Sequence, residues 1–243
     1  MVVVTGAQHV LFKGTGGENS TCQFVDNGRG QNNAGSGNIA AGYHYYIATG
    51  NDFIIDGCVH SGSGGYGVHN FGGATNVIVR NSIFKNTGMT TGGNGISAIR
   101  VAYAGAQAYN NIVYNSNGNA IEAHGPNTLV YNNTIYNIKS WGILVDSTVT
   151  VKNNIVVKAG LSGDGSENIG GFNYSGSAVS NNACVNGWTI PTACSVTTDP
   201  RFVDPANGDF RLRPTSPAMG MGAFPGSAVT PPPAPLTVLP TRT

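Results

Sequence analysis

The sequence predicts an all-β solenoid built from short strands, and three observations predict it. Two adjacent segments, 119–141 and 142–158, share one layout: a short apolar run, a turn, a second run, an Asn pair and a third run. The two pairs, Asn132–Asn133 and Asn153–Asn154, lie 21 residues apart. A unit of about 20 to 25 residues cannot bury its own apolar face, so such a period is typical of stacked repeats. Alternation with period two within each run favours strand over helix.

The composition narrows the class of protein. The chain has 243 residues, enough for one domain or one solenoid. Its 40% hydrophobic content and its β-branched runs favour an ordered β architecture, although only 9% of the residues are charged. A net charge of +1 gives no strong field, so nucleic acid and membrane are not expected partners. No long apolar run that could cross a membrane occurs, nor does a P-loop, a GxSxG elbow or an HExxH motif.

Residues 1–42 contain two apolar runs and then a Gly/Asn-rich stretch, and we expect an irregular first coil or N-terminal cap there. The opening residues have no basic region and no apolar leader, and they resemble the middle of a strand. We therefore expect a leader or further coils upstream of this sequence.

The four cysteines lack the CxxC spacing of a zinc site. Cys184 and Cys194 bracket a short loop, where a disulfide is one interpretation. Cys58 is either a buried small hydrophobe or the partner of Cys22. Low charge, abundant Asn, Gly, Ser and Thr, and an even cysteine count favour an extracellular or cell-surface protein.

Residues 43–187 divide into repeats that bring the predicted total to six or seven coils. Each repeat has one residue at its second corner, and Asn suits such a corner because it tolerates left-handed backbone and because stacked amides bond to one another. The predicted corner residues are Gly57, Asn81, Asn111, Asn133, Asn154 and Asn182.

This pattern resembles the right-handed parallel β-helix superfamily, the pectin-lyase-like fold. The resemblance implies three parallel sheets, called PB1, PB2 and PB3, with an Asn ladder between PB2 and PB3. Segment 188–227 contains DPRFVDPANGDFRLRPTSPA and resembles a closing segment of secreted polysaccharide-active proteins, so we expect it to cap the open sheet edges. Residues 228–243 are Pro-rich and are predicted to form an extended tail.

The outer face of PB1 is the predicted site. Its inward residues are predicted to be Val68, Ile99, Ile121 and Ile143. The next residue on each strand then points outward, and the residue two further on does the same. The two outward columns are His69, Arg100, Glu122, Leu144 and Phe71, Ala102, His124, Asp146. Long insertions before PB1 strands are expected to frame this face. A plain solvated sheet face is the alternative.

Two reactions fit this patch. In a polysaccharide lyase, Arg100 or His124 would be the base or would neutralise a uronate carboxylate. The resemblance implies a Ca²⁺ ion held by Glu122 and Asp146, although the dense Asp cluster of such sites is absent from this sequence. In an inverting glycosidase, Glu122 and Asp146 would flank the bond with Cα atoms ~8 Å apart. The Asp-Asp and Gly-His-Gly motifs of polygalacturonases are absent, so this reaction ranks second.

Aromatic residues near the patch are expected to bind sugar rings. The predicted substrate-binding residues are His69, Phe71, Tyr103 and Trp141. Further rings near the patch are Tyr43, Tyr45, Tyr46 and Tyr66, of which we expect Tyr45 to pack between coils. His60 is predicted to lie at a strand end or turn.

The leading hypothesis is an extracellular lyase that cleaves an acidic, uronate-containing polysaccharide by β-elimination. The competing class is a non-catalytic protein: a carbohydrate-binding adhesin, a phage spike on the virion surface, or a fibre subunit that self-associates end to end.

Overall fold

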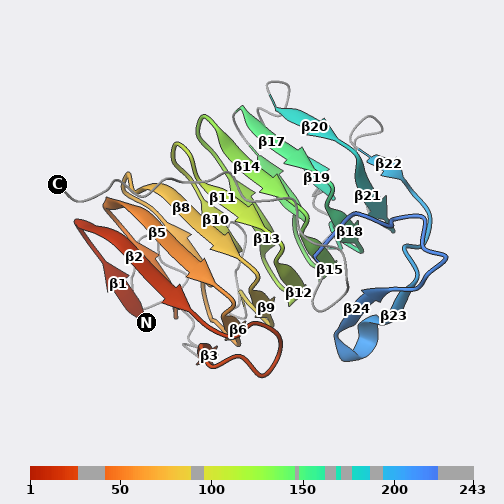
Figure 1. Cartoon of the computed structure of the whole chain (residues 1–243), viewed down its shortest axis with the longest axis horizontal. Helices are drawn as coiled ribbons and strands as arrows, with labels where there is room; N and C mark the ends of the chain where they lie inside the picture. The colour runs from red at the N-terminus through yellow and green to blue at the C-terminus, as the bar shows by residue number, and fades with distance from the viewer. Residues whose placement is uncertain are drawn as a thin grey trace.

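The computed structural model describes residues 1–26, 42–88, 96–145, 148–161, 168–170, 177–186 and 194–223. Its strands form three parallel sheets. The coils of the chain stack along one axis, with the N-terminal coil at one end of the stack (Figure 1). The predicted parallel β-helix is therefore confirmed. No helix in the described part of the chain is long and apolar enough to cross a membrane.

Each turn of the chain adds one strand to each sheet. PB1 contains, in order, β1 (Val2–Val4), β4 (Tyr45–Ile47), β7 (Val68–Asn70), β10 (Ser97–Val101), β13 (Asn119–Ala123), β16 (Ile143–Val145) and β19 (Ile169–Gly170). PB2 contains β2 (Ala7–Lys13), β5 (Gly50–Asp56), β8 (Thr75–Arg80), β11 (Gln107–Tyr109), β14 (Thr128–Tyr131), β17 (Val149–Lys152) and β20 (Ala178–Ser180). PB3 contains β3 (Gln23–Val25), β6 (Val59–Ser61), β9 (Ile83–Lys85), β12 (Ile112–Ser116), β15 (Thr134–Ile138), β18 (Ile155–Val157), β21 (Asn182–Val185) and β22 (Cys194–Val196).

The first coil, which we expected to be irregular, contributes a strand to all three sheets. Its strand β2 pairs with β5 in parallel from Ala7 to Lys13. A disulfide between Cys22 and Cys58 joins this coil to the second one. The Gly/Asn-rich stretch 27–41 lies outside the described residues.

The interior is a continuous apolar core of stacked side chains. The predicted inward column of PB1 is confirmed, because all four of its members are fully buried: Val68, Ile99, Ile121 and Ile143. Burial stabilises such a stack by about 25 cal/mol per Å² of apolar surface, and each coil supplies the cover that its neighbour needs.

The Asn ladder is confirmed for four of its predicted members. The side-chain amide of Asn133 donates to Asn154 Oδ1 at 2.9 Å, and that of Asn154 donates to Asn182 Oδ1 at 3.0 Å. Asn111 donates to Asn133 Oδ1 at 3.1 Å in the same way. These buried amides also accept backbone N–H groups of the preceding coil, so they satisfy polar groups that water cannot reach.

Gly57 and Asn81 were placed in this ladder wrongly. In the coil of Asn81, the ladder position belongs to Ser82. The backbone N–H of Ser82 donates to Asn111 Oδ1 at 3.1 Å, and its Oγ accepts from the N–H of Cys58 at 3.1 Å. Gly57 and Asn81 lie one residue earlier, with φ of 69° and 52°. That left-handed position is the one taken by the first Asn of each later pair, so a single Asn in a coil marks the corner and not the ladder.

The C-terminal segment covers a sheet face as well as an edge. Strand β22 continues the last edge of PB3, and a disulfide between Cys184 and Cys194 ties it to β21. The antiparallel hairpin of β23 (Phe202–Asp204) and β24 (Asp209–Leu212) packs its phenylalanines against Tyr136 on the outer side of PB3. We expected this segment to act as a cap on the sheet edges. Strand β22 does so for PB3, and the hairpin in addition buries apolar side chains against the side of the solenoid.

Candidate functional site

Strand register brings the predicted outward column of PB1 together. Tyr46 on β4 pairs with His69 on β7, which pairs with Arg100 on β10. Arg100 pairs with Glu122 on β13, and Glu122 pairs with Leu144 on β16. The side chains therefore follow one another along the coil stack.

Glu122 is the centre of this group. Its side-chain oxygens accept hydrogen bonds from Ser97 Oγ at 2.7 Å and from His124 Nε2 at 2.8 Å. Arg100 Nε lies 3.4 Å from Glu122 Oε1 and forms an ion pair with it. Burial alone would raise the pKa of the carboxyl group, but the hydrogen bond from His124, the charge of Arg100 and the hydrogen bond from Ser97 lower the pKa below its ordinary value. Glu122 is therefore an anion at neutral pH, with only 8% of its surface exposed.

A short chain of buried polar groups holds Glu122 from behind. Asn119 Nδ2 donates to Ser97 Oγ at 3.2 Å, and Asn119 Oδ1 accepts from the backbone N–H of Trp141 at 3.3 Å. Our sequence reasoning missed Ser97 and Asn119. They occupy paired positions at the starts of β10 and β13, so a polar residue repeated there was the available signal.

His69 is neutral in this surrounding. Burial first, and then the charge of Arg100, lower the pKa of His69 to about 4, against an opposing effect of Glu122. Arg100 Nη1 lies 3.4 Å from His69 Nε2, so Nε2 accepts and the proton sits on Nδ1. That Nδ1 is buried and has no hydrogen-bond partner among the described residues. The imidazole ring stacks on Tyr66, with ring centroids 4.1 Å apart.

Aromatic rings surround the cationic end of the patch. Tyr43 and Tyr46 contact His69 edge-on, at 5.2 and 5.4 Å between ring centroids. Phe71 is 46% exposed, and the guanidinium carbon of Arg100 lies 5.7 Å from its ring centroid. A charged, hydrogen-bonding group beside an exposed ring is a surface that suits an acidic sugar.

The remaining predicted residues are less closely joined to this group. The Tyr103 hydroxyl accepts from the backbone N–H of Gly72 at 3.0 Å, so it holds a turn beside Phe71. The backbone N–H of Trp141 donates to Asn119, and the side chain of Trp141 is half-buried. Asp146 lies outside the described residues.

The surroundings of Glu122 do not fit a calcium ligand. Both carboxylate oxygens already accept hydrogen bonds, and the nearest charged neighbour is a cation. The described residues contain no group of three or more His, Cys, Asp or Glu side chains that could hold a metal ion. The predicted metal role of Glu122 and Asp146 stays a prediction.

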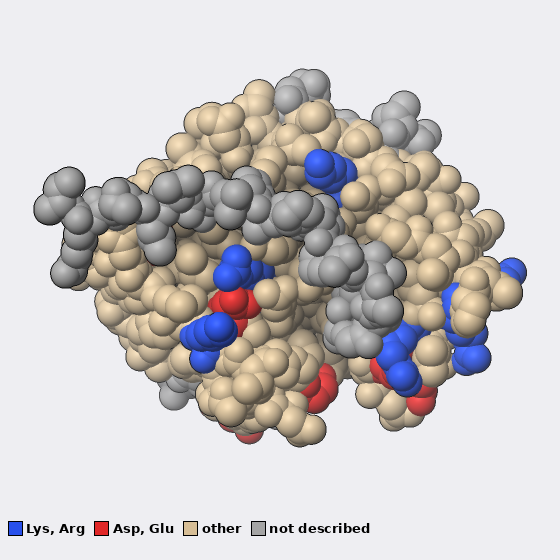
Figure 2. Space-filling model, viewed as in Figure 1, with Lys and Arg blue, Asp and Glu red and all other residues tan. Residues whose placement is uncertain are grey.

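Charged side chains are sparse elsewhere on the molecule. Figure 2 shows one face on which blue and red atoms gather in a few small groups on a largely uncharged surface. Arg100 and Glu122 form one of several ion pairs, as Arg80 with Asp56 and Arg211 with Asp209 do, and His124 joins their pair through its hydrogen bond to Glu122.

Comparison with known families identifies the fold family. A family profile described as "Right handed beta helix region" matches residues 46–199. The chain belongs to the right-handed β-helix family. A comparison with curated proteins finds no match. Members of one fold family can carry different activities, so the function of this β-helix has to be argued from the PB1 patch itself.

Proposed function

We propose that this β-helix binds an acidic, uronate-containing polysaccharide on the outer face of PB1 and cleaves it by β-elimination. The observation that carries the proposal is the hydrogen bond of 2.8 Å between His124 Nε2 and the Glu122 carboxylate, with Arg100 beside it. This arrangement combines an oriented imidazole with a cation that can face a substrate carboxylate.

Two features of the patch support binding of an acidic sugar: the positive charge of Arg100 and the aromatic rings beside it. Arg100 would pair with the uronate carboxylate, and a guanidinium group suits that planar anion. Phe71, Tyr46 and Tyr103 present rings or hydroxyl groups next to it, on which sugar faces and sugar hydroxyls can rest. The site runs along the stacking direction of the coils, so an extended glycan can span several of them.

Each residue has a part in the proposed reaction. His124, oriented by its hydrogen bond to Glu122, is the base that takes the proton from the carbon next to the uronate carboxyl group. Glu122 stabilises the imidazolium that forms, as an orienting carboxylate does. Arg100 stabilises the charge that develops on the substrate carboxylate. The bond from the next carbon to the glycosidic oxygen then breaks, a carbon–carbon double bond forms, and the leaving oxygen takes a proton from water.

The test is an absorbance assay for the unsaturated sugar product, over a panel of uronate polysaccharides with and without added calcium. We expect an increase with the wild type and its loss in His124→Gln and Glu122→Gln. Leu144→Ala is the matched control, because Leu144 lies in the same outward column without an ionisable group. A flat trace for the wild type on every substrate would contradict cleavage by elimination.

A second candidate function is binding without cleavage, as in an adhesin, a spike or a surface fibre. The feature that favours it is the small number of groups capable of chemistry in the described part of the patch, where Glu122 is the one carboxylate of the outward column. Retention of the wild type on an acidic polysaccharide, with neither unsaturated products nor new reducing ends, would favour this alternative. New reducing ends alone would favour the glycosidase. The two disulfides support an extracellular location for any of these functions.

A further inference from the structure

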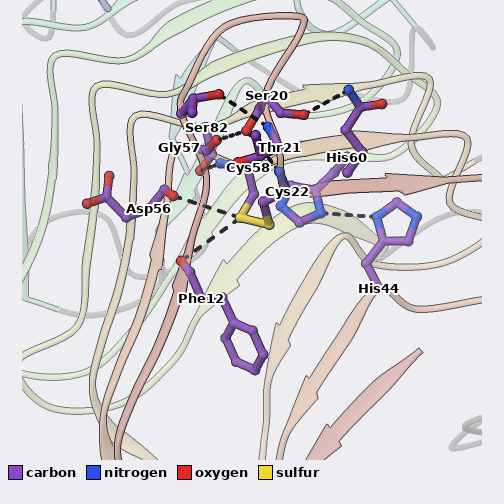
Figure 3. The surroundings of a disulfide bond; sticks show 12 residues. Phe12, Ser20, Thr21, Cys22, His44, Asp56, Gly57, Cys58, His60 and Ser82 are labelled. Atoms are coloured by element: carbon purple, nitrogen blue, oxygen red, sulfur yellow. Dashed lines mark hydrogen bonds between the residues drawn. A yellow bond between two sulfur atoms is a disulfide. The ribbon is translucent and has the colours of Figure 1, made fainter.

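A second pair of histidines lies inside the solenoid, away from PB1's outer face. His44 directly precedes β4, and His60 lies in the middle of β6. Both are fully buried, and their Nδ1 atoms are 3.3 Å apart (Figure 3). We expected His60 at a strand end or turn, which was wrong: its side chain faces the core.

His60 occupies the place of an aromatic core residue. Phe24, His60 and Phe84 are paired in register on β3, β6 and β9. Their rings stack, with centroid distances of 5.3 Å from His60 to Phe24 and 4.2 Å from His60 to Phe84. The imidazole therefore lies between two apolar rings, where a positive charge is poorly solvated.

One hydrogen bond joins the two rings when both are neutral. One Nδ1–H then donates to the other Nδ1. Each Nε2 is buried and has no hydrogen-bond partner among the described residues. A first proton added at the unprotonated Nε2 leaves this bond in place but puts a charge in the core, and a second proton makes both Nδ1 atoms donors and breaks the bond.

No anion faces the pair from the described elements packed around it. β3 and β9 contribute phenylalanine rings, and Tyr45 contributes a phenol whose pKa is raised by burial, so it stays uncharged. The amino group of Met1 adds a positive charge near His44. Of the nearby carboxylates, Asp26 is exposed at the end of β3 and Asp56 pairs with Arg80.

We infer that the His44–His60 pair is an acid-sensitive latch inside the second coil, which holds the start of β4 against β6 at neutral pH and loosens this contact when it is protonated. The Cys22–Cys58 disulfide joins the second coil to the first (Figure 3). Opening is therefore a local loosening of these coils around Phe24 and not a separation of one coil from the next. The latch does not depend on the function proposed for PB1.

The direction of the pH effect follows from the burial of the pair. Burial first, and then the amino terminus, lower the pKa of His44 to about 4. Burial and the neighbouring His44 lower the pKa of His60 well below its ordinary value. An opened coil exposes histidines with a pKa of about 6.5. Below that pH the opened state binds protons that the closed state does not, so the closed state loses stability as the pH falls from about 6.5 towards about 4.

The experiment compares thermal unfolding at about pH 7.5 and about pH 5, a range in which histidines change charge. We expect the melting temperature of the wild type to fall roughly 4–8 °C further on acidification than that of the double variant His44→Leu/His60→Phe. His9→Gln is the control, because His9 lies in the neighbouring first coil but is about half exposed and paired with Asp52. Equal falls in the wild type and the double variant would overturn the latch.

Hydrogen exchange of the wild type tests the same inference without a variant. After correction for the intrinsic effect of pH, acid should raise exchange of the backbone amides in β3, β4 and β6 over that in β14 and β15. Uniform exchange along the solenoid, or a change confined to the C-terminal coils, would overturn it.

Discussion

Two histidine clusters lie near each other in this β-helix, and they differ in how their charge is balanced. On the outer face of PB1, His124 bonds to the Glu122 carboxylate and His69 accepts from Arg100. Inside the solenoid, His44 and His60 bond to each other, between apolar rings. A carboxylate allows the outer cluster to gain or pass on a proton at modest cost. The inner pair lies between apolar rings, so it can only exclude a proton.

The largest expected effect is the loss of the carboxylate from the outer cluster. In Glu122→Ala, Arg100 keeps its charge without its ion pair, and Ser97 and His124 lose their acceptor. We expect a loss of about 2–4 kcal/mol in the free energy of unfolding. Denaturant unfolding at neutral pH measures it, with Leu144→Ala as the control. A loss below that of the control would show that Glu122 does not hold the cluster together.

The buried histidines and Glu122 should respond to acid in separate pH ranges. The histidines with lowered pKa values, His44, His60 and His69, destabilise the fold as the pH falls from about 6.5 towards about 4. Glu122 has a lowered pKa, so its contribution is present above about pH 4.3 and is lost only as the pH falls through its value in the folded state. Unfolding curves measured in steps of pH should show two phases. In Glu122→Gln, the lower phase should shrink and the upper phase should remain.

Ser97→Ala should have a smaller effect than the loss of Glu122. It removes one hydrogen bond to a charged acceptor and leaves Asn119 Nδ2 without its partner. We expect a loss of about 1.5–3 kcal/mol in the free energy of unfolding, with a raised pKa for Glu122. The same pH series measures both. An unchanged lower phase would show that Ser97 does not contribute to the low pKa.

The smallest effect is expected inside the solenoid at neutral pH. His44→Leu/His60→Phe replaces two incompletely bonded polar rings by apolar side chains, and Phe at position 60 continues the ring stack of Phe24 and Phe84. We expect a change of less than about 1 kcal/mol in the free energy of unfolding. A loss as large as that of Glu122→Ala would mean that the inner pair stabilises the fold in the way the outer cluster does.

Much of the outer patch could be predicted because strands alternate with a period of two. Once Val68, Ile99 and Ile121 are placed inward, His69, Arg100 and Glu122 must face outward. Alternation places Ser97 inward with Ile99, so the period of two does not predict its hydrogen bond to the outward-facing Glu122. The prediction of the Asn ladder was wrong at Asn81, because a shift of one residue exchanges a corner position for a ladder position.

The sequence by itself determined the repeat, the three strands per coil, the inward and outward faces of PB1 and most of the Asn ladder. Each of these depends on a short local period, which an alternating strand or a left-handed corner imposes. The tertiary structure decided which polar groups touch between strands of different sheets or coils. Ser97 meets Glu122 of the next coil, His44 meets His60 across the inside of one coil, and the C-terminal hairpin meets the side of PB3. These contacts depend on the lengths of the intervening turns and on the register of stacking, which no local pattern contains.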